Sequence, residues 1–200
     1  MDSEAWDEKY SASELVWSAE PNRFVAAELD DLPPGRAVDL ACGEGRNSLW
    51  LASKGWDVVG VDFSRVALDK ARSIAERRGL HVDWVLADVT TYQPPAGAFD
   101  LVLVAYLHLP AAAMGSVFES SVAATAPNGV VFVIGHDITN IADGYGGPQD
   151  PAVLYGPDDV TAHLNGLVID RAERVRRPVD TADGDVEAID VLVRAHRPGP

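Results

Sequence analysis

A turn with two glycines near residue 43 combines residue types that could hold a nucleoside cofactor. Asp39 precedes Gly43 by four positions, Gly45 follows, and Asp62 ends the next apolar run. Glycines let the backbone approach a ligand closely, and a helix starting near Gly45 would direct its free N–H groups and positive dipole end at the same point. A carboxylate at Asp62 can accept hydrogen bonds from both hydroxyls of a ribose. These residues predict a nucleoside cofactor without saying which one.

The spacing within the turn disfavours one class of cofactor. A dinucleotide site requires a third glycine, in the order G-x-G-x-x-G. Here Ser48 stands at that position, after the bulky Arg46 and Asn47. A nicotinamide-dependent oxidoreductase is therefore kept only as an alternative.

Two histidines follow predicted strands and could do acid–base chemistry. His108 lies in "AYLHLP" and His136 in "VIGHDIT". The carboxyl ends of parallel strands are where open α/β sheets bind ligands, and a histidine there can act as a general base near neutral pH. Both are predicted as catalytic residues, and the alternative for each is a polar loop residue that holds the backbone.

An alternation of strands and helices would position these residues. It predicts a parallel sheet with helices on both faces. Strands are expected at 37–41, 57–61, 81–87, 98–104 and 130–135, and helices at 46–54, 65–78 and 111–125. Ser64 is expected to cap the second of these helices and Gly79 to end it.

The chain departs from this alternation at both ends. Residues 1–35 predict a short helical cap, and residues 36–200 a single α/β domain. In the last third, a helix is expected at 158–164, then strands at 167–175 and 188–196 joined through a polar loop around "TADGD". Two strands with no helix between them favour an antiparallel pair at one edge of the sheet. The run at 170–178, "DRAERVRRP", favours a charged edge strand over an anion site.

Four motifs in order carry a resemblance to a known family. D-L-A-C-G-E-G, then V-D-F-S, A-D-V and F-D-L-V, resemble the class I S-adenosylmethionine (SAM) dependent methyltransferases. The stretch "CGEGRNSLWLASKGWDVVGVDFS", with "WDEKY" upstream, is similar to the tellurite-resistance and thiopurine-methyltransferase-like branch. The resemblance implies a Rossmann-like, doubly wound, seven-stranded and mainly parallel sheet with an antiparallel edge strand. It also implies SAM as cofactor and methyl transfer to a small-molecule nucleophile.

The resemblance assigns the cofactor residues one by one. Those around the methionine moiety would be Asp39 and the backbone of Ala41, Cys42, Gly43 and Gly45. Those at the nucleoside would be Asp62 for the ribose, Phe63 against the adenine, and Asp88 with the backbone of Val89 at the adenine amino group. Ala105 and Tyr106 would face the sulfonium and the acceptor. Ala41 stands where the family has its first glycine, and Arg46 would support the cofactor carboxylate or pair with a surface acid.

The acceptor side is less patterned. The turn-rich segment 136–157 is expected to form a substrate lid, with Tyr145 as an aromatic cover, and Trp17 of the N-terminal cap is expected to close the opposite side. A base is needed only if the nucleophile keeps its proton, so oxygen, nitrogen, sulfur and metalloid acceptors all remain open. A metal site is not expected, because no recognised ligand spacing occurs.

Composition narrows the partners. The formal net charge is −15, from 31 acidic against 16 basic residues, which opposes the phosphate neutralisation that nucleic-acid binding needs. No apolar run approaches the roughly 20 residues that span a bilayer, and the single cysteine allows no internal disulfide. We expect a cytoplasmic protein that binds neither nucleic acid nor membrane. A non-catalytic SAM binder and a protein-interaction module remain alternatives, and the oligomeric state is open.

Overall fold

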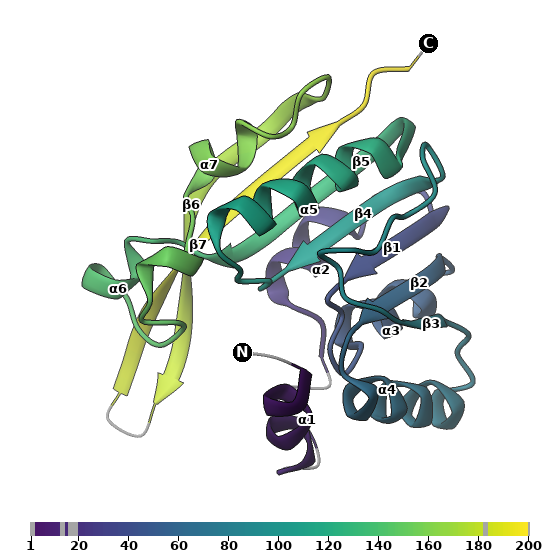
Figure 1. Cartoon of the computed structure of the whole chain (residues 1–200), viewed down its shortest axis with the longest axis horizontal. Helices are drawn as coiled ribbons and strands as arrows, with labels where there is room; N and C mark the ends of the chain where they lie inside the picture. The colour runs from purple at the N-terminus through teal and green to yellow at the C-terminus, as the bar shows by residue number, and fades with distance from the viewer. Residues whose placement is uncertain (1–2, 13–14, 16–19, 182–183, 200) are drawn as a thin grey trace. The chain divides into compact units, whose positions relative to one another are not determined.

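The computed structural model describes residues 3–12, 15, 20–181 and 184–199. Its strands form one seven-stranded sheet in the order β3-β2-β1-β4-β5-β7-β6 (Figure 1). The strands are β1 (Arg36–Leu40), β2 (Asp57–Asp62), β3 (Asp83–Leu86), β4 (Phe99–Ala105), β5 (Thr125–His136), β6 (Val168–Thr181) and β7 (Gly184–His196). The helices are α1 (Ser3–Ser11), α2 (Arg23–Leu29), α3 (Arg46–Ser53), α4 (Arg65–Arg78), α5 (Ala111–Ala124), α6 (Asn140–Asp143) and α7 (Pro157–Thr161), with a 3-10 turn η1 (Pro151–Val153).

Two compact units make up the chain. The first comprises residues 1–93 and 99–103, and the second comprises residues 94–98 and 104–200. The predicted division at residue 35 into a cap and one domain stays a prediction. None of the helices in the described ranges is long and apolar enough to cross a membrane.

The first unit follows the predicted alternation closely. β1 and β2 pair in parallel, as do β2 and β3. Helix α4 has the predicted bounds because both ends carry local signals. The Ser64 hydroxyl accepts a hydrogen bond from Ala67 N (3.1 Å), and Gly79 ends the helix with a φ of 65°. The parallel strands and their connecting helices bring the glycine turn and Asp62 to the ends of neighbouring strands.

The second unit contains the antiparallel edge that the sequence predicts. β7 pairs with both β5 and β6 in antiparallel fashion, and β6 is the edge strand. The expected strand bounds of 167–175 and 188–196 are too short, because β6 extends to Thr181 and β7 begins at Gly184. Cross-strand contacts explain the extension: Val179 is the partner of Val186, and Arg176 forms an ion pair with Glu187 (3.0 Å).

The length of this hairpin matters for the site. Pairing between β5 and β7 ends where His136 lies opposite Asp190, whereas β7 continues its pairing with β6 down to Gly184. From Asp190 back to Gly184 the hairpin is thus a two-stranded arm made of β6 and β7 (Figure 1). Helix α7 is shorter than the helix expected at 158–164, since it ends at Thr161.

Candidate functional site

The glycine turn between β1 and α3 has the tight backbone that a cofactor cradle requires. Ala41, Gly43 and Gly45 have φ values of 60°, 57° and 76°. A Cβ on Gly43 would lie 2.8 Å from the hydroxyl of Tyr10, and one on Gly45 would lie 2.5 Å from the ring of Trp84. Left-handed backbone and close packing therefore both demand glycine at these two positions.

Asp39, near the end of β1, has a hydrogen-bond partner for only one of its two carboxylate oxygens among the described residues. Its side chain is buried, and Oδ2 accepts a hydrogen bond from the Ser48 hydroxyl (2.6 Å). Oδ1 is also buried and has no hydrogen-bond partner among the described residues. Burial raises the pKa of Asp39 to about 7, despite the opposing bond from Ser48. An orphaned carboxylate oxygen beside a glycine cradle fits the ammonium group of a bound SAM molecule.

Ser48 also explains the missing third glycine. In a dinucleotide motif this position allows close packing of helix and strand. Here the hydroxyl of Ser48, itself fully buried, holds the Asp39 carboxylate instead. The departure from the dinucleotide pattern thus has a structural purpose within this turn.

Asp62 ends β2 next to the glycine turn, as predicted. Its Oδ2 accepts from Gly43 N (2.7 Å) and its Oδ1 from Ser64 N (2.8 Å). Burial raises the pKa of Asp62, against these N–H donors. The carboxylate is fixed in orientation, and each oxygen retains a lone pair for a further donor such as a ribose hydroxyl.

The remaining predicted cofactor residues of the first unit surround the same strand ends. Backbone N of Ala87 donates to Asp62 O (3.0 Å), so the A-D-V segment follows directly beside Asp62. Asp88 is exposed, and its Oδ1 accepts from the backbone N (2.8 Å) and hydroxyl (2.7 Å) of Thr90. This unit holds ten of the predicted cofactor residues, namely Asp39, Ala41, Cys42, Gly43, Gly45, Arg46, Asp62, Phe63, Asp88 and Val89. Burial raises the pKa of Cys42, which fits a packed residue rather than a nucleophile.

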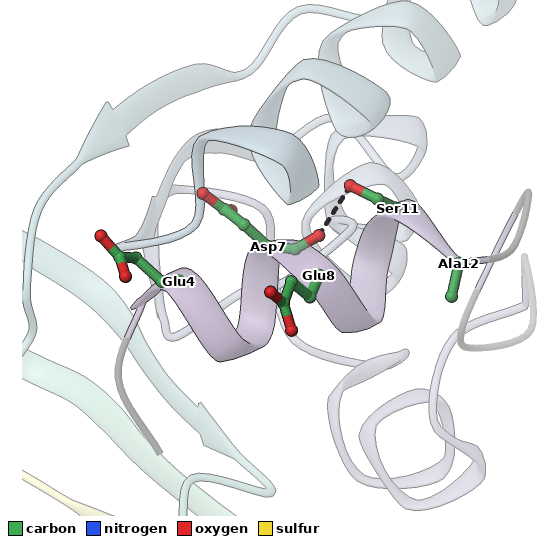
Figure 2. A pocket seen from close by; sticks show the side chains of 5 residues that line it. All are labelled: Glu4, Asp7, Glu8, Ser11 and Ala12. Carbon is green, nitrogen blue, oxygen red and sulfur yellow. Dashed lines mark hydrogen bonds between the residues drawn. The ribbon is translucent and has the colours of Figure 1, made fainter.

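Helix α1 packs onto this part of the first unit. Asp7 Oδ1 accepts from the Ser64 hydroxyl and from Val66 N (3.3 Å) at the start of α4. Lys70 Nζ donates to the Tyr10 carbonyl oxygen (2.5 Å), which fastens the other end of the helix. Figure 2 shows an open pocket along α1, where the Ser11 hydroxyl donates to the Asp7 carbonyl (2.7 Å). The lining of this pocket, Glu4, Asp7, Glu8, Ser11 and Ala12, includes none of the predicted site residues.

The second unit contains a connected polar cluster around His136. His136 and Asp190 are directly opposite on β5 and β7, and His136 Nδ1 lies 3.2 Å from Asp190 Oδ1. Both atoms are buried, and neither makes a hydrogen bond of good geometry within the described ranges. Asp190 Oδ2 accepts from the Tyr106 hydroxyl (2.7 Å) and from Arg177 Nε (2.7 Å). Burial alone would raise the pKa of Asp190, but His136, Arg177 and Tyr106 together hold it below its ordinary value.

His108 lies in the same cluster and packs against His136. Its ring stacks on His136 with 5.5 Å between centroids, and its Nε2 accepts from the backbone N of His136 (3.4 Å). Burial, and then the neighbouring His136, lower the pKa of His108 to about 4. His108 is therefore neutral at physiological pH, with one ring nitrogen already engaged.

Tyr106 has a strained backbone at the end of β4. Its φ is 55°, which non-glycine residues rarely adopt. The conformation is held by the bond from Tyr106 N to Ile134 O (2.7 Å) and by the contact of its hydroxyl with Asp190. Strain of this kind costs about 1–2 kcal/mol and clusters at functional sites.

The predicted lid and aromatic covers are only partly placed by the structure. A Cβ on Gly147 would lie 2.8 Å from the imidazole of His136, so the loop backbone covers that ring closely. Tyr145 is half exposed (50%) in the same loop. Trp17 lies outside the described residues, and its proposed role stays a prediction. Ala105 ends β4 immediately before Tyr106.

Asp190 and Arg177 do not stand out in the sequence, although they organise the cluster. The hydroxyl of Tyr106 and the carboxylate of Asp190 come together across 84 residues of sequence. One signal was present, since Asp190 is the only charged residue within the apolar run "AIDVLV". A buried acid in such a run requires partners.

Comparison with known proteins agrees with the geometry. Residues 37–129 match the profile of the family described as a methyltransferase domain. The demethylmenaquinone methyltransferase of Thermus thermophilus is 44% identical over 75 residues, which cover 36% of this chain and 34% of that protein. The 2-heptyl-1-hydroxyquinolin-4(1H)-one methyltransferase of Mycobacteroides abscessus is 26% identical over 180 residues, which cover 82% and 79%. Relatives also include rRNA methyltransferases, such as RlmD of Thiobacillus denitrificans, 29% identical over 149 residues that cover 72% of this chain and 31% of that protein.

Several of these relatives are much longer than the matched region. The chain spans only about a third of the Thermus relative and about a fifth of another, the small-subunit rRNA methyltransferase C of Alcanivorax borkumensis.

Solved structures show the same fold. TehB from Haemophilus influenzae superposes with a TM-score of 0.75 at 15% identity, covering 98% of this chain and 66% of that one. The N-methyltransferase NodS from Bradyrhizobium japonicum, solved with S-adenosylhomocysteine, gives a TM-score of 0.73 at 20% identity and covers 98% of both chains. A 58-residue segment is also 33% identical to TehB, covering 29% of this chain and 20% of that protein. Residues 37–129 thus match a methyltransferase domain, and the chain shares the fold of TehB and NodS.

Proposed function

We propose that this protein transfers the methyl group of SAM to a hydroxyl group of a small molecule, and that His136 removes the hydroxyl proton. The observation that carries the proposal is the pairing of His136 with the buried carboxylate of Asp190. A thiolate or tertiary amine would need no base, so a histidine held in this way favours an acceptor that keeps its proton.

The first unit would hold the cofactor. Asp39 Oδ1 would accept a hydrogen bond from its ammonium group, the turn at Gly43 and Gly45 would cover its methionine moiety, and Asp62 would take the ribose hydroxyls. Bound SAM supplies a methyl group on a positively charged sulfur, which is a good leaving group. These residues contribute binding and alignment rather than bond-making chemistry.

The second unit would supply the base. Because Nδ1 of His136 lies 3.2 Å from Asp190 Oδ1, Nε2 would be the nitrogen left to meet the acceptor. Nε2 would take the hydroxyl proton, and the bound cofactor would supply the methyl group to the oxygen and leave as S-adenosylhomocysteine. Asp190 stabilises the resulting imidazolium, while Tyr106 and Arg177 fix the carboxylate. The low pKa of His108 and its bond to His136 N suit a positioning role better than that of a base.

A small acceptor fits the protein better than a nucleic acid. The net charge of −15 opposes phosphate binding, and the relative from Mycobacteroides abscessus is named for a hydroxylated quinolone. Some relatives are rRNA methyltransferases, but that similarity does not offset the negative charge of this chain, which opposes RNA binding. The only cysteine is buried in the glycine turn, and we propose a reducing, cytoplasmic location.

A panel assay tests the proposal. Transfer from SAM is measured to hydroxyaryl compounds, thiols and amines, for the wild type and for His136→Gln and His108→Gln. We expect transfer to hydroxyl acceptors, and a fall in kcat of about 10²-fold or more in His136→Gln, with SAM affinity retained. The His136→Gln deficit should shrink at high pH, where the acceptor ionises without help. Equal kcat in the wild type and His136→Gln at all pH values would refute the assignment of the base.

A further inference from the structure

Arg177 is only partly used by the contacts that the structure gives it. Its Nε donates to Asp190 Oδ2 (2.7 Å) and lies 3.1 Å from the Tyr106 hydroxyl. A guanidinium group carries five N–H donors, and four of them belong to the two terminal nitrogens. Those nitrogens make no hydrogen bond in the described ranges. The side chain is mostly buried (23% exposed), so the arginine head is held rather than free in solvent.

The hairpin places this arginine beside the proposed base. Arg177 lies opposite Ala188, two residues from Asp190 along β7, and therefore on the same face as Asp190. Asp190 connects the two groups directly, with Oδ2 on Arg177 and Oδ1 near His136. The guanidinium carbon also lies 5.7 Å from the centre of the Tyr106 ring. The carboxylate of Asp190 therefore lies between the Arg177 guanidinium and the His136 imidazole.

Neutralising Asp190 does not account for this arrangement fully. The contact with Asp190 uses Nε alone. The two terminal nitrogens remain, and such a pair can form bidentate hydrogen bonds with a planar carboxylate. For residues 170–178 the sequence favours a charged edge strand. The structure agrees for Arg176, which is 60% exposed and pairs with Glu187. Arg177 points to the opposite face and differs from Arg176 in both burial and partner.

We propose that the terminal nitrogens of Arg177 bind a carboxylate on the methyl acceptor, which makes the acceptor a hydroxylated carboxylic acid. This inference rests on the proposed hydroxyl methylation, which it makes more specific. The carboxylate would anchor the acceptor through Arg177, and the hydroxyl would meet His136. The net charge of −15 opposes anion binding in general, so the held guanidinium would supply the local positive charge that favours the anion over a neutral analogue.

Matched pairs of acceptors test the inference. Each hydroxyaryl carboxylic acid, for example 3-hydroxybenzoate or 4-hydroxybenzoate, is compared with its primary amide, and the readout is the ratio of their kcat/KM values. This ratio cancels any general loss of activity in a variant. We expect the wild type to prefer the acids by about tenfold or more, Arg177→Gln to bring the ratio close to one, and Arg177→Lys to retain part of the preference.

Arg174→Gln is the matched control. Arg174 also binds a buried carboxylate through Nε, that of Asp137 (2.8 Å), but it lies on the opposite face and is 51% exposed. It should keep the wild-type ratio. A ratio near one in the wild type, or an unchanged preference in Arg177→Gln, would overturn the inference while leaving hydroxyl methylation intact.

Failure of the proposed function is distinguishable from failure of the inference. If no acceptor of either kind is methylated, binding still decides: calorimetric titration of 4-hydroxybenzoate into the protein saturated with S-adenosylhomocysteine should show affinity that Arg177→Gln abolishes and Arg174→Gln retains. Absence of binding in the wild type, or equal binding in Arg177→Gln, contradicts the carboxylate site.

Discussion

Cofactor binding should release a proton from Asp39, and this can be measured without knowing the acceptor. Burial raises the pKa of Asp39 from 3.8 to about 7. That difference corresponds to about 4 kcal/mol against ionisation, at about 1.4 kcal/mol per tenfold. Below pH 7 the carboxyl therefore keeps its proton in the free protein. The ammonium group of a bound cofactor beside Oδ1 would favour the ionised form, so binding would expel that proton.

The magnitude follows from linkage. If the bound state ionises Asp39 fully, affinity scales with the ionised fraction in the free protein, and it should rise roughly fifteenfold between pH 5.5 and pH 7. Titration calorimetry with S-adenosylhomocysteine, which keeps the amino group, measures the affinity. Repetition in buffers of different ionisation enthalpy counts the released protons. Asp39→Asn should bind more weakly at pH 7, with almost no pH dependence and no proton release.

Two neighbours require controls. Asp62 and Arg46 both act on the Asp39 carboxyl, Asp62 raising its pKa and Arg46 lowering it. Asp62→Asn should therefore keep a pH-dependent affinity, displaced to lower pH. The reasoning is refuted if wild-type affinity is flat from pH 5.5 to 7, or if Asp39→Asn keeps the same slope. The stability of the free protein offers a second test. The folded state holds this proton up to about pH 7, whereas the unfolded chain loses it near pH 4. As the pH rises from 4 to 7, the free energy of unfolding should therefore fall more in the wild type than in Asp39→Asn.

Three further results are expected. Asp62→Ala should weaken SAM binding by about 1.5–3 kcal/mol, the range for hydrogen bonds to a charged group, and unchanged calorimetric affinity would remove the ribose assignment. Asp190→Asn should lower the free energy of unfolding in urea by about 2–4 kcal/mol at pH 7, because it leaves Arg177 without its counter-ion. Since the folded pKa of Asp190 is lowered, its contribution is present above about pH 4 and lost below, so the difference from wild type should narrow in acid; a gap constant with pH would contradict this. Ala41→Gly should stabilise the fold by about 0.5–1 kcal/mol, the relief of a φ of 60° less the extra chain entropy of glycine, and destabilisation in urea would count against strain there.

Local signals explain what the sequence predicts well. Helix α4 begins after Ser64 and ends at Gly79 because the cap and the left-handed stop lie within the helix's own neighbourhood. The glycine turn is equally contiguous, since Gly43 and Asp62 belong to adjacent strand ends of one β-α-β unit. Patterns of this length are visible in a single sequence.

Non-local pairing explains what the sequence does not predict. The arm of β6 and β7 contains Pro178 and polar residues that suggest a loop, and only pairing such as that of Arg176 with Glu187 makes it a hairpin. Asp190 gains its role from Tyr106, far away in sequence, and from the register that sets it opposite His136. The place of His136 after a strand was predictable, but its contact with Asp190 was not.

Methyl transfer itself is the most direct test of the account. The protein would be incubated with SAM carrying a deuterated methyl group and a panel of hydroxylated carboxylic acids, and the products analysed by mass spectrometry. The account predicts a labelled methyl ether that requires His136 and disappears in Asp62→Ala at limiting cofactor. Saturable SAM binding with no labelled product from any hydroxyl, thiol or amine acceptor would contradict it and leave a cofactor-binding protein without transferase activity.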